Sequence, residues 1–410
     1  GDALLNLEII RRMNIEVIET PDEGQRSRIS SMLTACNFII DGIFGTGLNS
    51  DVRGFYSQVI TDVNSTGKPV MAIDIPSGLN ADTGQVMGVS IKADLTVTFG
   101  FPKLGQLLFP GADLVGRLTR TDIGIPDSVS NEIDSKYKMI EPDDFSYLFN
   151  IEKRDIHKGS RGHLLVLAGS AGKTGAAVLT ALGALRSGAG LVTVGIPESL
   201  NPVLEGKLTE AMTLPLPETS DGTLSLKAEK EIVKFMADKT AVAIGPGLSV
   251  NDETSALVRK IIGQTDIPMV IDADGLNALA GHLEVLAEYK GTGILTPHPG
   301  EMGKLTGVKN NDIQADRVGY AAGFAAEYGC YLVLKGAGTI VAEPYGKINV
   351  NPTGNQALSS GGTGDVLTGM IAGFQARGLT ALKAAQAGVY MHGLAADFLA
   401  EEMGCSGYLT

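Results

Sequence analysis

Short apolar runs alternate with stretches of helical spacing along almost the whole chain, and this alternation constrains the fold more than any other feature. In the first part, apolar runs lie at residues 15–19, 37–44, 69–75 and 94–99, and helical patterns lie at 25–35 and 55–64. Buried strands that alternate with helices form βαβ units, which build a parallel sheet. The sequence therefore predicts an α/β fold.

The second part of the chain repeats this pattern on a larger scale. Strands are expected at residues 163–168, 191–196, 241–245, 269–272, 293–296, 331–335 and 339–342. Helices are expected to follow Gly175, Ser225, Asn251, Ile313, Gly364 and Thr380. A chain of 410 residues predicts two or three domains. The polar, mixed stretch at 131–150 places the boundary near residue 140, which gives domains of residues 1–140 and 141–410.

Charge and cysteine content restrict the partners and the compartment. The 33 basic and 46 acidic residues give a net charge of −13, which disfavours sequence-independent nucleic-acid binding. Phosphorylated ligands must then meet backbone N–H groups or local cations. No apolar run approaches the ~18 residues of a membrane helix. Three widely spaced cysteines without a CxxC pair, and no basic-then-apolar leader, lead us to expect a cytoplasmic protein without membrane or nucleic-acid partners.

The strongest single motif is a glycine-rich turn before a helix. Gly361, Gly362 and Gly364 precede apolar residues of helical spacing, so their bare backbone lies at a helix N-terminus. Unpaired N–H groups and the helix dipole make such a place an anion hole. Asp365, in the first turn, could accept the proton of a substrate hydroxyl that attacks phosphorus. The alternative is an ordinary turn, because Asp also favours a first helical turn.

Two further turns follow predicted strands, and each has a structural alternative. The glycines of residues 335–339 would let a flat nucleotide approach the backbone, or they form a hairpin turn between two strands. Two prolines stiffen the loop that holds His298 and Glu301 at a strand end. A lone His in such a loop is more often a surface residue than a catalyst.

Another turn carries two carboxylates. Asp272 and Asp274 flank a single residue between a strand and a helix, with Asn277 following on that helix. These carboxylates could position Mg²⁺ through waters, or the turn is an N-cap. We favour the N-cap.

One stretch mimics a nucleotide-binding P-loop. Gly172, Lys173 and Thr174 lie between a predicted strand and a helix, but the earlier glycine that a P-loop requires is replaced by Leu167. We therefore exclude an ordinary P-loop NTPase. The loop stays a ligand-contact candidate, with Ala171 at its tip.

The order of the motifs resembles a known pair of domains. The motifs of the second part lie at residues 158–163, 168–175, 245–247, 272–277, 296–301, 335–339 and 360–365. Together they resemble the ADP- or ATP-dependent NAD(P)H-hydrate dehydratase domain, which has a ribokinase-like fold. Residues 41–48 and 74–80 resemble the NAD(P)H-hydrate epimerase domain. The pairing in one chain is similar to that of the bifunctional NAD(P)H-hydrate repair enzymes.

The resemblance implies phosphorylation of the hydroxyl on the hydrated nicotinamide ring of the S epimer, followed by loss of phosphate. Asp365 would be the base. Gly361, Gly362 and Thr363 would hold the transferred phosphoryl group. ADP or ATP, with Mg²⁺, would bind at Lys335, Gly336, Ala337, Gly338, Thr339 and Gly364. The hydrate would lie against Ala171, Gly247, His298 and Asp365. The motifs look bacterial, and such members of the family favour ADP.

For the first domain, the resemblance implies a Rossmann-like three-layer fold that interconverts the R and S hydrates. The substrate would be held by Gly45, Thr46, Gly47, Leu48, Asn49, Ser50, Asp51 and the catalytic Asp74. Asp41 and Ser77 would bind K⁺. An earlier family segment, with an Asn for K⁺, has no counterpart here, so we expect this domain to be truncated at its start. We also expect a homo-oligomer.

Two alternatives remain open. The 74–78 segment could be a strand and a turn, since the 45–50 stretch lacks the third glycine of a dinucleotide fingerprint. The second domain could be a ribokinase-like kinase of a vitamin precursor alcohol, with a non-catalytic N-terminal binding module. Such a kinase would release a stable phosphorylated product, whereas a dehydratase would release phosphate and reduced dinucleotide.

Overall fold

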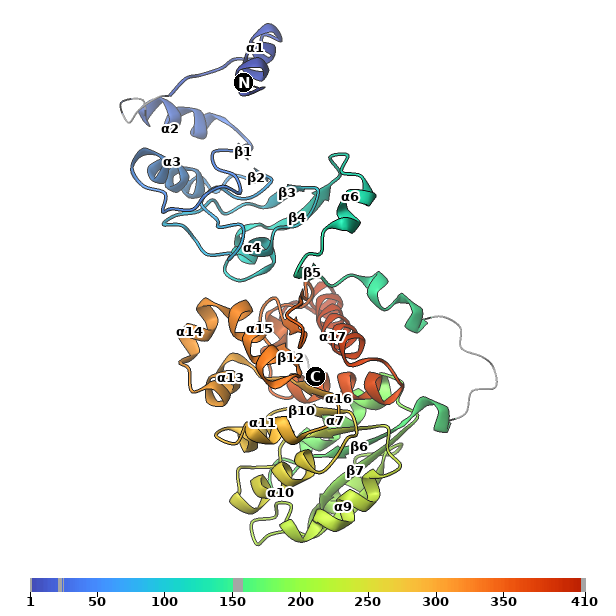
Figure 1. Cartoon of the computed structure of the whole chain (residues 1–410). Helices are drawn as coiled ribbons and strands as arrows, with labels where there is room; N and C mark the ends of the chain where they lie inside the picture. The colour runs from blue at the N-terminus through green and yellow to red at the C-terminus, as the bar shows by residue number, and fades with distance from the viewer. Residues whose placement is uncertain (1, 21–23, 25, 150–157, 407–410) are drawn as a thin grey trace. The chain divides into compact units, whose positions relative to one another are not determined.

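A computed structural model describes residues 2–20, 24, 26–149 and 158–406 of the chain (Figure 1). The chain divides into two compact units, residues 1–132 and 133–410. Residues 133–140, which the sequence analysis placed in the first domain, include β5 (Tyr137–Met139). This strand pairs in parallel with β14 (Ile348–Val350) of the second unit. Its short, mostly exposed pattern gives no apolar signal in the sequence.

The first unit contains one parallel four-stranded sheet in the order β1-β2-β3-β4. Its strands are β1 (Ile39–Asp41), β2 (Val70–Ile73), β3 (Leu95–Phe99) and β4 (Arg117–Thr121). Its helices are α1 (Asp2–Arg12), α2 (Arg26–Ala35), α3 (Gly54–Ser65), α4 (Leu104–Leu107), α5 (Gly111–Leu114) and α6 (Asp127–Glu132). The strand expected at residues 15–19 is wrong. That segment has no regular structure, and Ile15 and Val17 are exposed with no strand beside them.

This sheet is covered on one face. Ile60 and Val63 of α3 pack with Val70 and Ala72 in a buried cluster on that face. The strand register places Ile40, Ile73 and Phe99 together on the other face. They are 57%, 41% and 38% exposed. Parallel sheets are normally covered on both faces, so within the described residues this unit has two layers where the resemblance implied three.

The second unit contains a ten-stranded sheet in the order β5-β14-β13-β12-β11-β10-β9-β6-β7-β8. The remaining strands are β6 (His163–Leu167), β7 (Leu191–Pro197), β8 (Met212–Leu216), β9 (Ala241–Ile244), β10 (Met269–Ile271), β11 (Gly293–Leu295), β12 (Tyr331–Leu334) and β13 (Ile340–Ala342). β13 runs antiparallel to both neighbours, and the other pairs are parallel. All seven strands predicted for this part are present; β5, β8 and β14 were missed.

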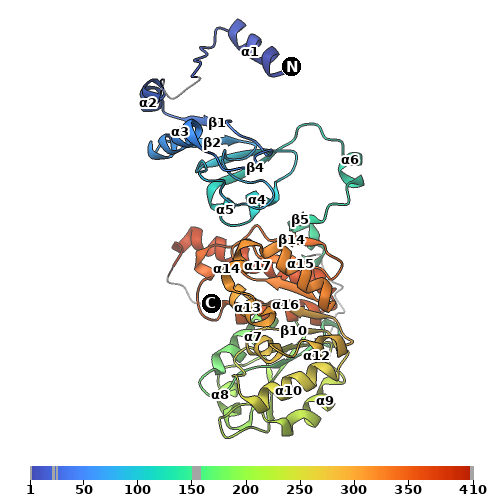
Figure 2. The same ribbon diagram turned by 60° about the vertical axis from the view of Figure 1, so that its left-hand side comes forward.

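Helices cover both faces of this sheet (Figure 2). The chain steps from β6 to β8 in one direction and from β9 to β12 in the other. Right-handed crossovers therefore put their helices on opposite faces. The helices are α7 (Thr174–Arg186), α8 (Asn201–Glu205), α9 (Glu229–Met236), α10 (Asp252–Gly263), α11 (Asp274–Leu279), α12 (Glu284–Glu288), α13 (Pro299–Thr306), α14 (Asn310–Ala315), α15 (Arg317–Tyr328), α16 (Thr363–Ala376) and α17 (Ala381–Met403). Short 3-10 turns lie at Pro142–Asp144, Ser146–Phe149, Lys158–Arg161, Glu198–Leu200, Leu226–Ala228 and Gln356–Leu358.

Close packing of α16 against α7 fixes the helix that follows the glycine-rich turn. A Cβ atom at Gly369 would lie 2.0 Å from the carbonyl oxygen of Thr180, so only glycine allows the two helices to approach this closely. The buried Leu367 and Ile371 of α16 join the main core of the unit. Among the described residues, no helix is both long and apolar enough to cross a membrane.

Candidate functional site

The loops after β6 and β9 meet where the strand order reverses, which is where open α/β sheets bind ligands. Gly169 N donates to the carbonyl of Pro246 at 2.8 Å, and Ser170 Oγ donates to that of Gly247 at 2.7 Å. Gly247 has φ +65, and a Cβ atom there would lie 2.9 Å from Cβ of Ala176. The structure thus brings together the loops of Ala171 and Gly247, both expected in the hydrate site.

The glycine-rich turn opens α16 as the sequence predicted. Gly362 is the N-cap with φ +98, and no side chain caps the helix. Thr363 Oγ1 lies 2.9 Å from the carbonyl oxygens of both Leu358 and Ser360, which closes the preceding loop. The first N–H groups of a helix have no partner within the helix. The start of α16 can therefore receive an anion.

A buried ion pair lies beside this helix start. Lys335 Nζ donates to Asp272 Oδ1 at 2.7 Å, and Thr368 Oγ1 donates to Asp272 Oδ2 at 2.6 Å. A Cβ atom at Gly364 would lie 3.5 Å from Lys335 Nζ, so the ammonium adjoins the first turn of α16. Burial disfavours the charge of Lys335, but Asp272, Glu301 and other carboxylates raise its pKa. The ammonium is therefore charged at neutral pH.

Asp365 differs from an ordinary aspartate. Burial raises the pKa of Asp365 to about 6, the carboxylates of Asp272, Asp274 and Glu301 act in the same direction, and Lys335 opposes them. A carboxyl group with this pKa is still mostly ionised at neutral pH, yet it accepts protons better than an exposed one. The geometry fits a general base beside an anion hole.

Residues 335–339 form the hairpin turn between β12 and the antiparallel β13, which was one of the two open interpretations. The buried Arg317 of α15 braces this turn by donating to the carbonyls of Leu334, at 3.1 Å, and Ala337. Burial lowers the pKa of Arg317 to about 10. Sequence reasoning missed Arg317, since its partners are backbone atoms that no motif displays. The hairpin interpretation is thus confirmed. The glycines still leave the backbone bare, so nucleotide binding at this turn stays a prediction.

His298 has a structural role. It is the N-cap of α13, and its Nδ1 accepts from Gly300 N at 3.0 Å and from Glu301 N at 3.2 Å. Glu301 in turn accepts from His298 N at 2.9 Å and lies 3.8 Å from Lys335 Nζ. Its Nε2 lies 3.5 Å from Glu301 Oε2, and the imidazole is 56% exposed, so its open side can still meet a ligand.

The N-cap predicted for the 272–277 turn is wrong in its details. The cap of α11 is Ala273, with φ +49, and no side chain caps the helix. Asp274 Oδ2 instead accepts from Ser249 N at 2.8 Å and from Lys173 Nζ at 3.2 Å. Asp272 is engaged by the ion pair described above. Across the described part of the chain, no group of three His, Cys, Asp or Glu side chains is placed to hold a metal ion.

In the first unit, Asp41 and Ser77 come together across β1 and the turn after β2. Ser77 N and Oγ donate to the two carboxylate oxygens of Asp41 at 2.7 and 2.6 Å, and both residues are buried. Phe44 N donates to Ser77 Oγ at 2.8 Å. A Cβ atom at Gly78 (φ +97) would lie 1.9 Å from the carbonyl oxygen of Val89, so glycine is required in this turn.

Asp74, at the end of β2, pairs with Lys103. Its Oδ1 accepts from the Lys103 ammonium, from Phe99 N at 3.0 Å and from Thr98 Oγ1 at 3.2 Å. Burial opposes ionisation, but these hydrogen bonds, led by that of Lys103, lower the pKa of Asp74. Lys103 was not singled out from the sequence, because it follows the next strand and joins Asp74 only in the fold.

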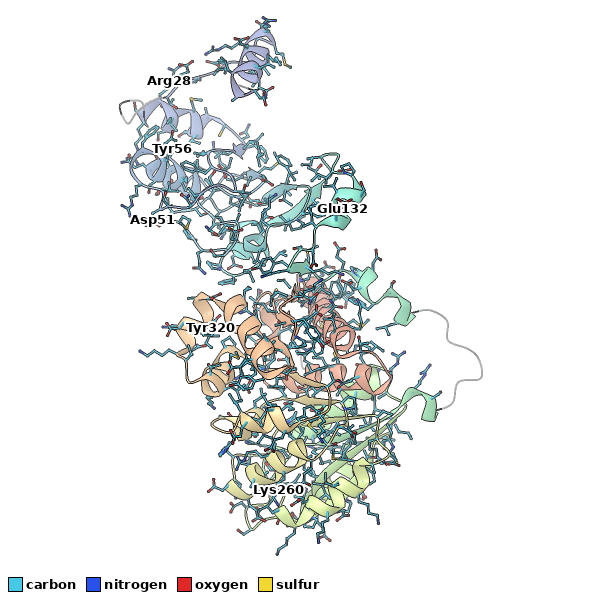
Figure 3. All side chains as sticks on the ribbon, in the orientation of Figure 1. Arg28, Asp51, Tyr56, Glu132, Lys260 and Tyr320 are labelled. Atoms are coloured by element: carbon cyan, nitrogen blue, oxygen red, sulfur yellow. The ribbon has the colours of Figure 1, made fainter. Side chains whose placement is uncertain are left out.

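The expected substrate loop of this unit, residues 45–51, follows β1 and leads to α3. Most of it is exposed, and Leu48 is held by Asn80 Nδ2 through its carbonyl at 3.4 Å. Asp51 lies at the end of this loop (Figure 3) and forms an ion pair with the exposed Arg53. A Cβ atom at Gly45 or Gly47 would meet nothing within 4 Å, so steric demand within the chain does not explain either glycine.

Both units match families of known proteins. A family model described as NAD(P)H-hydrate dehydratase matches residues 164–410, and one described as the YjeF-related protein N-terminus matches residues 1–105. The bifunctional NAD(P)H-hydrate repair enzyme Nnr of Moorella thermoacetica is 42% identical over 98% of this chain and 76% of that protein.

Solved structures resemble the second unit. The Bacillus subtilis ADP/ATP-dependent NAD(P)H-hydrate dehydratase, co-crystallised with ATP and Mg²⁺, is 35% identical with a TM-score of 0.58, covering 66% of this chain and 93% of that one. A ribokinase-like superfamily protein of Enterococcus faecalis, 22% identical, has a TM-score of 0.56 over 66% of this chain and 90% of its own and supports the fold alone. The second unit is ribokinase-like, and the chain belongs to the family of bifunctional NAD(P)H-hydrate repair enzymes.

Proposed function

We propose that the second unit restores NADH or NADPH from the S epimer of the hydrate, with ADP or ATP as phosphoryl donor. The observation that supports this proposal most directly is the place of Asp365 in the first turn of α16, a helix that no side chain caps. The pKa of Asp365 is raised to about 6. A base and an anion hole next to each other are what attack of a hydroxyl on phosphorus requires. Family membership supports the substrate.

In the proposed reaction, backbone N–H groups bind the phosphoryl group and one carboxylate takes up a proton. The N–H groups of Gly361, Gly362 and Thr363 hold the transferred phosphoryl group, and Lys335, Gly336, Ala337, Gly338, Thr339 and Gly364 bind the nucleotide. The hydrate lies against Ala171, Gly247 and His298. Its hydroxyl oxygen attacks the terminal phosphorus, the bond to the nucleotide breaks, and Asp365 takes the hydroxyl proton. Phosphate then leaves, a proton is lost from the adjacent ring carbon, and the ring double bond returns.

The residues of the site fit Mg²⁺ poorly as direct ligands. Asp272 accepts from Lys335 and Thr368, and Asp274 accepts from Lys173, so neither carboxylate is open. Mg²⁺ commonly keeps several waters and binds through substrate phosphates. We therefore propose that Mg²⁺ comes with the nucleotide, and no step is assigned to it.

For the first unit we propose epimerisation of the R and S hydrates, with Asp74 touching the substrate and residues 45–51 holding its phosphates. K⁺ fits the oxygen atoms of Asp41 and Ser77 because Asp41, unlike Asp272 and Asp274, accepts from the neutral donors Ser77 N and Oγ. Asp41 is 3% exposed, and no cationic side chain among the described residues pairs with it. A buried carboxylate without a counter-charge is costly, so a bound cation would stabilise it. K⁺-dependent protection of the first unit from hydrogen exchange tests this assignment without using activity.

The direct test is turnover of hydrated NADH by the purified chain with ADP or ATP. Return of the reduced-nicotinamide absorbance together with free phosphate supports the dehydratase, whereas a stable phosphorylated product would identify a kinase. If the Asp74→Asn variant still epimerises the hydrate at an unchanged rate, the first unit is a non-catalytic binding module. We further propose that the chain is a cytoplasmic homo-oligomer, which cell fractionation and light scattering of the purified chain test.

A further inference from the structure

Three separate elements meet at the start of α16, and one side chain from each is hydrogen-bonded in series. Thr368 of α16 donates to Asp272 after β10, and Asp272 accepts from Lys335 after β12. Thr368 is 0% exposed and Asp272 is 1% exposed, so water does not compete for these bonds. Thr368 lies four residues after Gly364 on the same face of the helix. One helix therefore carries both the anion hole and the hydroxyl that orients Asp272.

Of two carboxylates that contact the ammonium of Lys335, Asp272 is the nearer and the one that accepts a hydrogen bond, since Glu301 Oε2 lies 3.8 Å away. A lysine ends in a point charge on a flexible four-carbon stem. Asp272 Oδ1 fixes it through one of its three N–H groups, at 2.7 Å, and the same ammonium adjoins Gly364, where a Cβ atom would lie 3.5 Å away. Its other N–H groups are then available to an oxygen atom of a phosphate bound at this end of α16.

We infer that Thr368 and Asp272 are positioning residues that hold Lys335 against the nucleotide phosphates at the start of α16. This inference rests on the proposed function and deepens it, because it gives Lys335 a task in the transfer step as well as in nucleotide binding. Neither Thr368 nor Asp272 needs to touch substrate. Misplacing a charge by a fraction of an ångström weakens the stabilisation of a transferring phosphoryl group.

The sharpest test removes the Thr368 hydroxyl and leaves every charge in place. Thr368→Val keeps the volume, and we expect it to lower kcat/KM for the nucleotide about tenfold or more, since a buried hydrogen bond to a charged group is lost. KM for the hydrate should stay near that of the unaltered chain. Thr368→Ser restores the hydroxyl and should recover most of the activity.

Thr96→Val is the matched control. Thr96 is also 0% exposed, and its hydroxyl donates to the carbonyl of Val115 at 2.7 Å, within the first unit. It should lose stability without a specific rise in the nucleotide KM. Wild-type kinetics for Thr368→Val, or a Thr368→Ser variant as impaired as Thr368→Val, would overturn the inference.

Calorimetric binding of ADP to the same variants separates this inference from the proposed function. If the unaltered chain does not turn over the hydrate, the proposed function fails. Weaker ADP binding by Thr368→Val than by Thr368→Ser would still support the positioning of Lys335. Equal ADP affinity of these two variants would contradict it.

Discussion

Asp365 of the second unit and Asp74 of the first are both expected to act on the same dinucleotide hydrate, yet the fold treats them in opposite ways. Burial raises the pKa of Asp365 to about 6, helped by three neighbouring carboxylates. Burial also opposes the charge of Asp74, but Lys103 and two further donors overcome it and lower the pKa. One carboxyl group is prepared to take up a proton, and the other is kept ionised.

The difference shows that the surroundings of a carboxylate, more than its residue type, decide its pKa. Lys335 lies near Asp365 but is held by Asp272, so it only partly offsets the acidic surroundings. Lys103 donates directly to Asp74. The position of one lysine relative to each aspartate therefore separates the proposed general base, Asp365, from the ionised Asp74.

The largest expected effect is the loss of dehydration in Asp365→Asn. The amide keeps the shape of the side chain but cannot take the hydroxyl proton, so the rate should fall by roughly two to four orders of magnitude. The measurement is the return of the reduced-nicotinamide absorbance, with circular dichroism as the control for folding. If the Asp365→Asn variant retains most of the rate, Asp365 is not the base, and the proposed difference in role between Asp365 and Asp74 is wrong.

The next largest effect should be a difference between the pH dependence of dehydration and that of epimerisation. Protonated Asp365 cannot act as a base, so kcat/KM should fall by about tenfold per pH unit below a pKa of about 6. Epimerisation should keep its rate to lower pH, because the pKa of Asp74 is lowered. Coincident acid limbs for the two activities would contradict the assigned difference.

Lys103→Met should bring the two aspartates closer in behaviour. Loss of the ammonium removes the main contact that keeps Asp74 ionised, so the pKa of Asp74 should rise. Carboxyl titration by NMR measures this shift directly, and the acid limb of epimerisation should move with it. Lys92→Met, which changes an exposed lysine of the same unit, is the matched control. An unchanged Asp74 titration would show that burial and backbone donors set its charge.

The smallest effects concern stability, and their signs should be opposite. The folded-state pKa of Asp365 lies above its ordinary 3.8, so its charge opposes folding increasingly as pH rises from 3.8 to about 6 and fully above it. Asp365→Asn should therefore stabilise the second unit near pH 8 by on the order of 1–3 kcal/mol, and less near pH 5.

The folded-state pKa of Asp74 is lowered, so its contribution to stability is present above 3.8 and is lost as pH falls through the folded value. Asp74→Asn should therefore destabilise the first unit at neutral pH by about 1 kcal/mol. Denaturant-dependent hydrogen exchange measures the free energy of unfolding of each unit separately. Equal signs for Asp365→Asn and Asp74→Asn would contradict the electrostatic account of both sites.

The sequence predicted what depends on local pattern. Apolar runs gave the central strands of the second sheet, and Gly361, Gly362 and Gly364 gave the start of a helix, because both features depend on neighbouring residues. The edge strands β4, β5 and β8 were missed, since their exposed residues carry no continuous apolar signal. Residues 15–19 were wrongly predicted as a strand because they form an apolar run. An apolar run forms a strand only where a neighbouring strand pairs with it.

The parts of the site that could not be predicted are contacts between distant segments. Asp272 and Lys335 are 63 positions apart and Asp272 and Thr368 are 96 apart, so no spacing rule joins them. Arg317 binds backbone carbonyls, which every residue has. Such pairings follow from the order of the strands, which local sequence does not encode.

The hydroxyl of Thr363, which ties the carbonyls of Leu358 and Ser360, has a consequence for how the nucleotide arrives. A loop that is tied by hydrogen bonds of its own chain has little freedom left to lose on binding. Capture of the phosphates should then be a single fast step with a favourable enthalpy and only a small entropic penalty, and no slower rearrangement of this loop should follow the encounter.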